Sequence, residues 1–340
     1  FGWALIQNLT PILLGGLGDK YGRKRILFYS VLISIIGFVL IGLFRDVVLF
    51  SVSTLILGLG LGLFKPTLQG LMSNSMNHEQ KSIGWGINVM LINLAVFLAP
   101  PLAKYLESFS WFWVFAGSGI VISLNFILLL FVKDNSDVTK FQKNSFIIKD
   151  AVKVLFDPKV LYFLLIMSGF AMIYMQFYET LPNFIYDWVD TSNVAKMLGL
   201  PESMLMKTGL GMMIDFKWLY SINSGLIVLF IVLVTWLISR YSMIYALMFG
   251  VILSSAGLFV SGASTYGSIT IAGMVIYTFG EMITNPKITE FMSKTGDDTK
   301  RSLYMGLVNV SFGIGLAGGS LLGGFIYRNF GEKSGLALKY

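Results

Sequence analysis

Long apolar segments recur along the whole chain, and each has the length of a membrane-spanning helix. A helix needs about 20 predominantly apolar residues to cross the hydrocarbon core of a bilayer. The segments do not alternate polar and apolar residues with period 2, so the pattern disfavours a transmembrane β-barrel. We predict ten spans, at approximately residues 1–17, 26–44, 47–74, 83–103, 111–132, 158–180, 218–239, 243–261, 267–292 and 303–327.

Composition supports an all-α polytopic membrane protein. The 340 residues are 55% hydrophobic and 13% charged, whereas a soluble domain of this size keeps a much more polar surface. The chain has no cysteine, which excludes disulfides and cysteine-based metal sites. Its one histidine, His78, lies in a polar loop without a second ligand, so we expect no metal and no cofactor.

The distribution of lysine and arginine predicts the orientation of the spans. Fifteen of the 25 basic residues fall in one set of loops and eight in the opposite set. Loops rich in Lys and Arg remain in the cytoplasm, so the loop at Asp19–Arg25 and the central linker are predicted to be cytoplasmic. The net charge of +7 is thus a topology signal rather than a sign of nucleic-acid binding. The expected partner of the surface is a lipid bilayer, in the inner (plasma) membrane.

A polar linker divides the chain into two predicted halves. We assign residues 1–132 to an N-terminal helical half, 133–157 to a cytoplasmic linker and 158–340 to a C-terminal helical half. Within the linker, residues 145–156 combine apolar and basic positions in a pattern typical of an amphipathic helix on a membrane surface. The long segment 182–217 is expected to be a loop on the opposite side.

A shift of 220 residues matches the two halves to each other. The matched residues lie in a span, a short basic loop and the next span, all in the same orientation, which predicts a parallel repeat. Seven pairs match without a gap: Gly60/Gly280, Pro66/Pro286, Met72/Met292, Ser73/Ser293, Lys81/Arg301, Ser82/Ser302 and Gly86/Gly306.

The segment Gly15–Leu27 resembles the signature loop of the major facilitator superfamily, with glycines, Asp19 and a basic run at the spacing of that motif. The resemblance implies a major facilitator fold of two pseudo-symmetric halves, with about ten of twelve transmembrane helices present and one missing at each end. It also implies that the loop is a conformational latch. The latch residues are Gly15, Asp19, Gly22, Arg23 and Lys24.

Two further segments resemble the proton-coupled oligopeptide transporters. The first is the glycine-rich run from Gly58 to Lys65 and Pro66, and the second is Tyr277–Glu281 followed by Asn285 and Pro286. This resemblance implies proton-coupled symport of di- and tripeptides. The first-helix motif of that family would precede Phe1.

Charged residues inside the spans are candidate functional groups, because an ion at membrane depth is costly unless paired or hydrated. Glu281 lies near mid-depth and is a candidate proton carrier, with a satisfied structural carboxylate as the alternative. Lys65 is a candidate partner for proton coupling, with snorkelling to the cytoplasmic surface as the alternative. Lys287 is expected to snorkel, and Glu179 to be solvated.

Polar residues within other spans are candidate substrate-binding groups, with a packing role as the alternative: Asn93, Tyr174 and Gln176. Gly315, Gly319 and Gly323 recur every fourth residue and predict a face of close helix packing. Neither a nucleophile–base constellation nor a nucleotide motif occurs in the sequence, so we do not expect an enzyme or an ATP-driven pump.

The sequence therefore predicts a monomeric secondary transporter that moves a small solute, with peptides as the leading class, by proton-coupled alternating access. Two alternatives stay open. One is a facilitator-superfamily transporter of another small organic solute or drug. The other is a transport-inactive membrane sensor.

Overall fold

The computed structural model describes residues 10–11, 14–77, 79–132, 147–208, 211–295 and 300–331. Within these ranges, nine helices are long and apolar enough to cross a membrane. They correspond to nine of the ten predicted spans, with ends that differ by a few residues. The first predicted span, 1–17, lies mostly outside the described residues, as do His78 and most of the linker.

The chain forms two compact units. Unit 1 comprises Phe1–Lys81, Leu98–Leu165 and Thr289–Ser311, and unit 2 comprises Ser82–Phe97, Ile166–Ile288 and Phe312–Tyr340. Helices α5, α8, α13 and α14 contribute to both. The predicted halves 1–132 and 158–340 stay a prediction.

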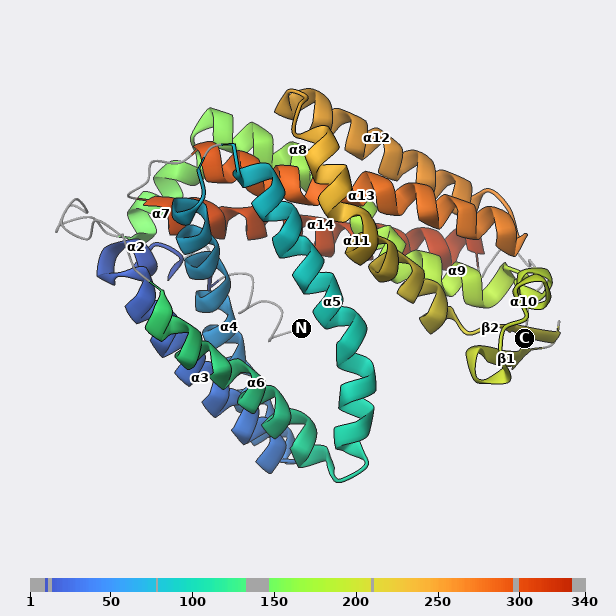
Figure 1. Ribbon diagram of the computed structural model, residues 1–340, viewed down its shortest axis with the longest axis horizontal. Coiled ribbons are helices and arrows are strands. Elements are labelled where there is room, and N and C mark those ends of the chain that lie inside the picture. The colour runs from blue at the N-terminus through green and yellow to red at the C-terminus, as the bar shows by residue number, and fades with distance from the viewer. Residues whose placement is uncertain are drawn as a thin grey trace. The chain divides into compact units, whose positions relative to one another are not determined.

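Unit 1 is built on three closely packed helices, and α3, α4 and α6 lie side by side in Figure 1. The Asp46 side chain accepts hydrogen bonds from the amides of Val48 and Leu49, which starts α4. The rings of Phe28 on α3 and Phe126 on α6 are 5.0 Å apart. The helices that contribute to this unit are α2 (Leu17–Tyr21), α3 (Arg23–Leu43), α4 (Val47–Ser75), α5 (Lys81–Glu107), α6 (Trp111–Phe131), α7 (Ile147–Leu155) and α14 (Arg301–Ile326), together with the first part of α8 (Pro158–Met175) and the last part of α13 (Gly267–Thr295).

The short helix α7 (Ile147–Leu155) lies within the segment 145–156, where the sequence predicts an amphipathic helix. Its Lys149 and Lys153 side chains are exposed, as are the apolar side chains of Val152 and Phe156. The position of α7 on a membrane surface stays a prediction.

Unit 2 contains one helical run that changes its hydrogen-bonding pattern midway. The run consists of α8 (Pro158–Met175), a π-helical turn (Gln176–Thr180) and α9 (Leu181–Trp188). The other elements are α10 (Ser192–Leu198), β1 (Leu205–Thr208), β2 (Gly211–Ile214), α11 (Phe216–Ile238), α12 (Met243–Gly262) and α13 (Gly267–Thr295).

The described residues of the segment 182–217 form an ordered cap rather than the expected loop. It consists of α9, α10 and an antiparallel hairpin in which Thr208 pairs with Gly211. Asp190 ties the cap to the start of α13, because its amide donates to the Thr265 carbonyl and its carbonyl accepts from Gly267, both at 2.8 Å. Thr191 Oγ1 also accepts a hydrogen bond from the Ile214 amide, at 2.9 Å.

The helix boundaries repeat with the predicted shift of 220 residues. The pairs α3/α12, α4/α13 and α5/α14 begin at Arg23 and Met243, Val47 and Gly267, and Lys81 and Arg301. Helices α4 and α13 both have 29 residues, each with an internal proline.

The repeat extends to individual packing contacts. A Cβ atom on Gly60 would lie 2.4 Å from Ser34 Oγ, and one on Gly280 would lie 2.4 Å from Ser254 Oγ. Ser34 and Ser254 are themselves related by the same shift. These small residues let α3 approach α4, and α12 approach α13, at equivalent places. The two copies of the repeat are therefore packed alike.

Candidate functional site

The signature loop is a tight turn between α2 and α3. Gly22 joins the two helices with φ of 94°, a backbone conformation that favours glycine. The helix residue Gly18 brings the loop close to its neighbours. A Cβ atom on Gly18 would lie 2.9 Å from the Thr67 side chain of α4 and 3.2 Å from Ser302 Oγ of α14. The glycine spacing of the motif thus has a steric reason.

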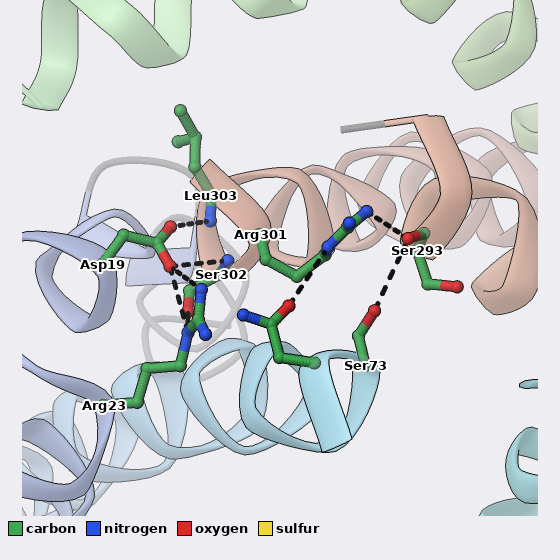
Figure 2. Close-up of polar contacts among 8 residues, drawn as sticks. Asp19, Arg23, Ser73, Ser293, Arg301, Ser302 and Leu303 are labelled. Atoms are coloured by element: carbon green, nitrogen blue, oxygen red, sulfur yellow. Dashed lines mark hydrogen bonds and ion pairs between the residues drawn. The ribbon is translucent and has the colours of Figure 1, made fainter. Parts of the chain in front are cut away.

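Asp19 caps the N-terminus of α14. Its carboxylate accepts hydrogen bonds from the amides of Ser302, at 3.1 Å, and Leu303, at 3.0 Å (Figure 2). These amides have no partner within their own helix, and the positive end of the helix dipole favours an anion there. Segments far apart in the sequence are therefore joined at one carboxylate.

Arg23 completes this contact as a buried ion pair. Its Nη2 atom lies 2.6 Å from Asp19 Oδ1, and its Nε atom donates to Ser302 Oγ at 3.0 Å. The side chains are almost fully buried, with Asp19 3% and Arg23 1% exposed. Burial raises the pKa of the Asp19 carboxyl group, while the Arg23 guanidinium and the two amides act to lower it. The other latch residues lie nearby in unit 1: a Cβ atom on Gly15 would lie 3.4 Å from the Ser302 carbonyl oxygen, and Lys24 Nζ donates to the Val132 carbonyl at 3.1 Å.

A second contact in unit 1 centres on the carbonyl of Ser293, near the end of α13. Lys81 Nζ donates to it at 3.0 Å. Arg301 Nη1 also donates to it (Figure 2). Cations favour the negative end of a helix dipole. The sequence had paired Lys81 with Arg301 only as repeat equivalents. Their common acceptor was missed, because a backbone carbonyl carries no sequence signal.

Glu281 is the centre of a polar cluster within the apolar span α13. It is 2% exposed, which agrees with its predicted burial. Asn223 Nδ2 donates to Oε2 at 3.0 Å, and Asn285 Nδ2 and the Tyr178 hydroxyl donate to Oε1 at 3.2 and 3.4 Å. All three donors are neutral side chains. Asn223 Nδ2 also reaches Thr278 Oγ1 at 3.0 Å. The carboxylate is therefore satisfied by hydrogen bonds within unit 2.

The candidate substrate-binding residues occupy three separate environments. The Tyr174 ring stands 4.6 Å from the Tyr178 ring, beside the Glu281 cluster. Gln176 Nε2 instead donates to the Gly319 carbonyl of α14 at 2.7 Å. Asn93 Nδ2 donates to the Val89 carbonyl one turn earlier in α5, at 3.0 Å.

Sequence reasoning missed two residues of the Glu281 cluster, Tyr178 and Asn223. Asn223 was detectable as a polar residue in an apolar span, whereas the position of Tyr178 depends on the π-helical turn. Lys65 has an exposed side chain and belongs to unit 1, so its pairing with Glu281 stays a prediction. Lys287 is only 2% exposed, so the expectation that it snorkels is wrong.

The glycine face of α14 is confirmed. A Cβ atom on Gly315 would lie 2.2 Å from Ala171 Cβ, and one on Gly323 would lie 2.6 Å from both Gln176 Oε1 and Thr180 Oγ1. Close approach of α14 to the α8–α9 run therefore depends on the absence of side chains at these positions.

A cavity of about 500 Å³ lies at one end of unit 2. Its lining includes Leu258 and Gly262, the repeat equivalents of Phe38 and Gly42. In unit 1 those two residues face α6, because a Cβ atom on Gly42 would lie 3.0 Å from Phe112 and one on Gly119 would lie 3.7 Å from Phe38. The cavity thus corresponds to a helix-packing surface, and we do not assign substrate to it.

These features define a multi-span helical membrane protein with duplicated architecture, a buried ion pair that caps α14 and a buried carboxylate. The sequence matches the Major Facilitator Superfamily over residues 1–320, and the chain belongs to that family. Members of this superfamily are transporters rather than enzymes.

Relatives and solved structures agree with this family. The chain is 21% identical over 327 residues to the multidrug resistance protein MdtH of Yersinia enterocolitica, covering 95% of this chain and 75% of that protein. MdtH of Shigella flexneri gives the same identity and coverage. The family and these bacterial relatives together identify the protein as a multi-pass protein of the inner (plasma) membrane.

Three solved structures share the fold. The human organic anion transporter MFSD10 has a TM-score of 0.70 at 16% identity, covering 96% of this chain and 76% of its own. The proton:xylose symporter XylE has a TM-score of 0.70 at 14% identity, covering 98% and 78%. The E. coli fucose:proton symporter FucP has a TM-score of 0.71 at 14% identity, covering 96% and 83%.

Proposed function

We propose that this protein is a proton-coupled secondary transporter that moves a small organic solute by alternating access. The observation that carries the proposal is the position of Glu281, a carboxylate buried in a membrane span and held by three neutral donors. A carboxylate in an apolar environment resists ionisation unless donors or a cation support it. Glu281 is therefore suited to bind and release a proton as its surroundings change.

Proton binding changes what Glu281 requires from its neighbours. The ionised carboxylate only accepts hydrogen bonds, whereas the protonated carboxyl group also donates one. A conformational equilibrium shifts when one state favours one protonation form over the other. The contact of Asp19 and Arg23 with α14 stabilises one of the two states and acts as the latch. Lys65 is retained in the proposal as a cation that supports ionised Glu281 in one state.

Two substrate classes follow from different observations. Di- and tripeptides follow from the resemblance of the segments around Lys65 and Glu281 to oligopeptide transporters. However, Gly60 and Gly62 in the first segment are packing residues, because Cβ atoms there would lie 2.4 Å from Ser34 Oγ and 2.6 Å from Thr10 Cβ. The names of the MdtH relatives favour a drug-like organic solute as the second candidate.

Uptake into proteoliposomes tests the proposal, with the purified full chain and with an imposed pH gradient or none. Labelled dipeptides and labelled lipophilic drugs are assayed in parallel, which separates the two substrate classes. We expect Glu281→Gln to abolish gradient-driven accumulation and to preserve exchange down a substrate gradient. The control is Glu202→Gln, which changes an exposed carboxylate in the cap.

Full gradient-driven accumulation by Glu281→Gln would remove this residue from the coupling mechanism. Loss of exchange as well would assign it a substrate-binding or structural role. Absence of counterflow for every solute tested, in folded wild-type protein, would favour the transport-inactive sensor.

A further inference from the structure

The π-helical turn Gln176–Thr180 lies next to the Glu281 cluster. It interrupts a run of α-helix that extends from Pro158 to Trp188. A π-helical turn accommodates one extra residue in the α-helical ladder, and such turns occur frequently at functional sites. Its removal or migration rotates the residues of the turn relative to the rest of the helix. The side chains of this turn are therefore well placed to change partners.

The hydroxyl group of Tyr178, in the middle of the turn, lies within hydrogen-bond distance of two acceptors. Its hydroxyl oxygen lies 3.2 Å from Asn223 Oδ1 and 3.4 Å from Glu281 Oε1. A hydroxyl group has one proton, so it donates to only one of them at a time. Ionised Glu281 competes for that proton, whereas protonated Glu281 has its own proton to donate. The protonation state of Glu281 thus decides whether the Tyr178 hydroxyl is held by α13 or by α11.

Other residues of the same turn hold α14. Gln176 Nε2 donates to the Gly319 carbonyl at 2.7 Å, and Thr180 Oγ1 donates to Gln176 Oε1 at 2.6 Å. Both side chains also lie against Gly323. One turn of helix therefore contacts Glu281 through Tyr178 and α14 through Gln176.

Phe177, the second residue of the turn, anchors the turn to the neighbouring helices. Its carbonyl accepts a hydrogen bond from the Tyr220 hydroxyl, and its ring stacks on Tyr277 with centroids 3.9 Å apart. A change at Tyr178 therefore rotates the turn about a fixed point instead of displacing it as a whole.

We propose that Tyr178 is the positioning residue for the proton-carrying carboxylate, and that the π-helical turn transmits the change in its hydrogen bond to α14. This inference rests on the proposed function of Glu281. In the described part of unit 2, the titratable groups that face Glu281 are tyrosines: Tyr174 and Tyr178 on the α8–α9 run and Tyr277 on α13. The pH-dependent change in hydrogen bonding therefore originates at Glu281 itself.

Spin labels on the reconstituted full chain test this inference, and the absence of native cysteine makes the labelling specific. The labels are placed at Phe259 on α12 and Leu321 on α14, which are 77% and 76% exposed. Their distance distribution is measured by pulsed electron resonance from acid to alkaline pH. Transport is measured over the same range.

We expect a pH-dependent change of distance in the labelled protein, and its loss in Tyr178→Phe. The transport profile of Tyr178→Phe moves to higher pH by about one unit, because the carboxylate loses one of its donors. Thr180→Val removes the hydrogen bond that orients the Gln176 side chain, so it keeps the pH dependence of transport but loses the distance change. The control Tyr162→Phe removes a hydroxyl from the exposed side of α8 and retains both responses.

A full distance change and an unshifted transport profile in Tyr178→Phe would overturn the inference. So would a wild-type protein whose label distance does not depend on pH. Neither result affects the proposed function, which fails separately if Glu281→Gln still accumulates substrate. Thr180→Val keeps the test decisive if Tyr178→Phe does not fold.

Discussion

Ser73 and Ser293, which are 220 residues apart in the chain, contact each other: Ser73 Oγ donates to the Ser293 carbonyl at 3.5 Å. The same shift of 220 residues relates the two halves of the repeat. Within unit 1, this contact holds the ends of α4 and α13 together, and Lys81 and Arg301 converge on the same Ser293 carbonyl.

This contact predicts a disulfide cross-link. The double variant Ser73→Cys/Ser293→Cys is expected to cross-link under mild oxidation and to lose transport, which a reducing agent restores. Alternating access requires the repeats to move apart on one side of the membrane, and a covalent bond between the ends of α4 and α13 opposes this. Mobility in gel electrophoresis measures the cross-link, and the single variants are controls. Full transport by the cross-linked protein would show that these ends do not separate.

Asp19→Asn is expected to reduce the turnover rate more than substrate binding. The substitution removes the ion pair with Arg23 and weakens the cap of α14, so it shifts the balance between conformational states without touching a substrate. Rates and binding constants are compared at matched expression. Arg25→Gln, an exposed change in the same loop, is the control. Equal turnover in wild type and Asp19→Asn would show that the loop only determines membrane orientation and is not a latch.

Gly22→Ala is expected to destabilise the latch loop by about 1–3 kcal/mol, because its φ of 94° is strained for any residue with a Cβ atom. The thermal unfolding midpoint of the purified protein measures the effect. Gly225→Ala is the matched control, since it lies in helix α11 and an added Cβ atom would meet no atom within 4 Å. A change of midpoint no larger than that of the control would contradict the steric account of the motif.

Gly315→Ala is expected to lower stability by about 1–3 kcal/mol through overpacking against Ala171, whose Cβ lies 2.2 Å from the new methyl group. Gly324→Ala, in the same helix, adds a methyl group with no atom within 4 Å. Thermal unfolding of the two variants is compared under identical conditions. Similar midpoints would mean that α14 is not held through its glycine face.

Hydropathy and charge were sufficient to predict nine described spans, because the length of a span is set by the bilayer. The repeat was predictable for a related reason: Gly60 and Gly280 make the same packing contact and so retain the same residue type. The role of Asp19 as a helix cap was not predictable. Its partners are backbone amides of a helix that begins some 280 residues later, and amides have no sequence signature.

The partners of Glu281 were also beyond sequence reasoning. Depth in the span predicted its burial, but Tyr178 meets it because of a π-helical turn, which shifts the helical register by one residue. The ordered cap was missed for another reason. Its α10 has seven residues and its strands four each, too few to give a periodic pattern.

The cap also offers experimental access to the membrane interior. Its backbone is bonded to the first turn of α13, the helix that bears Glu281, and α9 continues from the π-helical turn that bears Tyr178. An antibody fragment that recognises the β1–β2 strand pair and Asp190 would therefore bind to both helices from the side that the charge distribution predicts to be extracytoplasmic. Such a reagent would distinguish conformers in intact cells, and by holding one of them it would act as an inhibitor that never enters the bilayer.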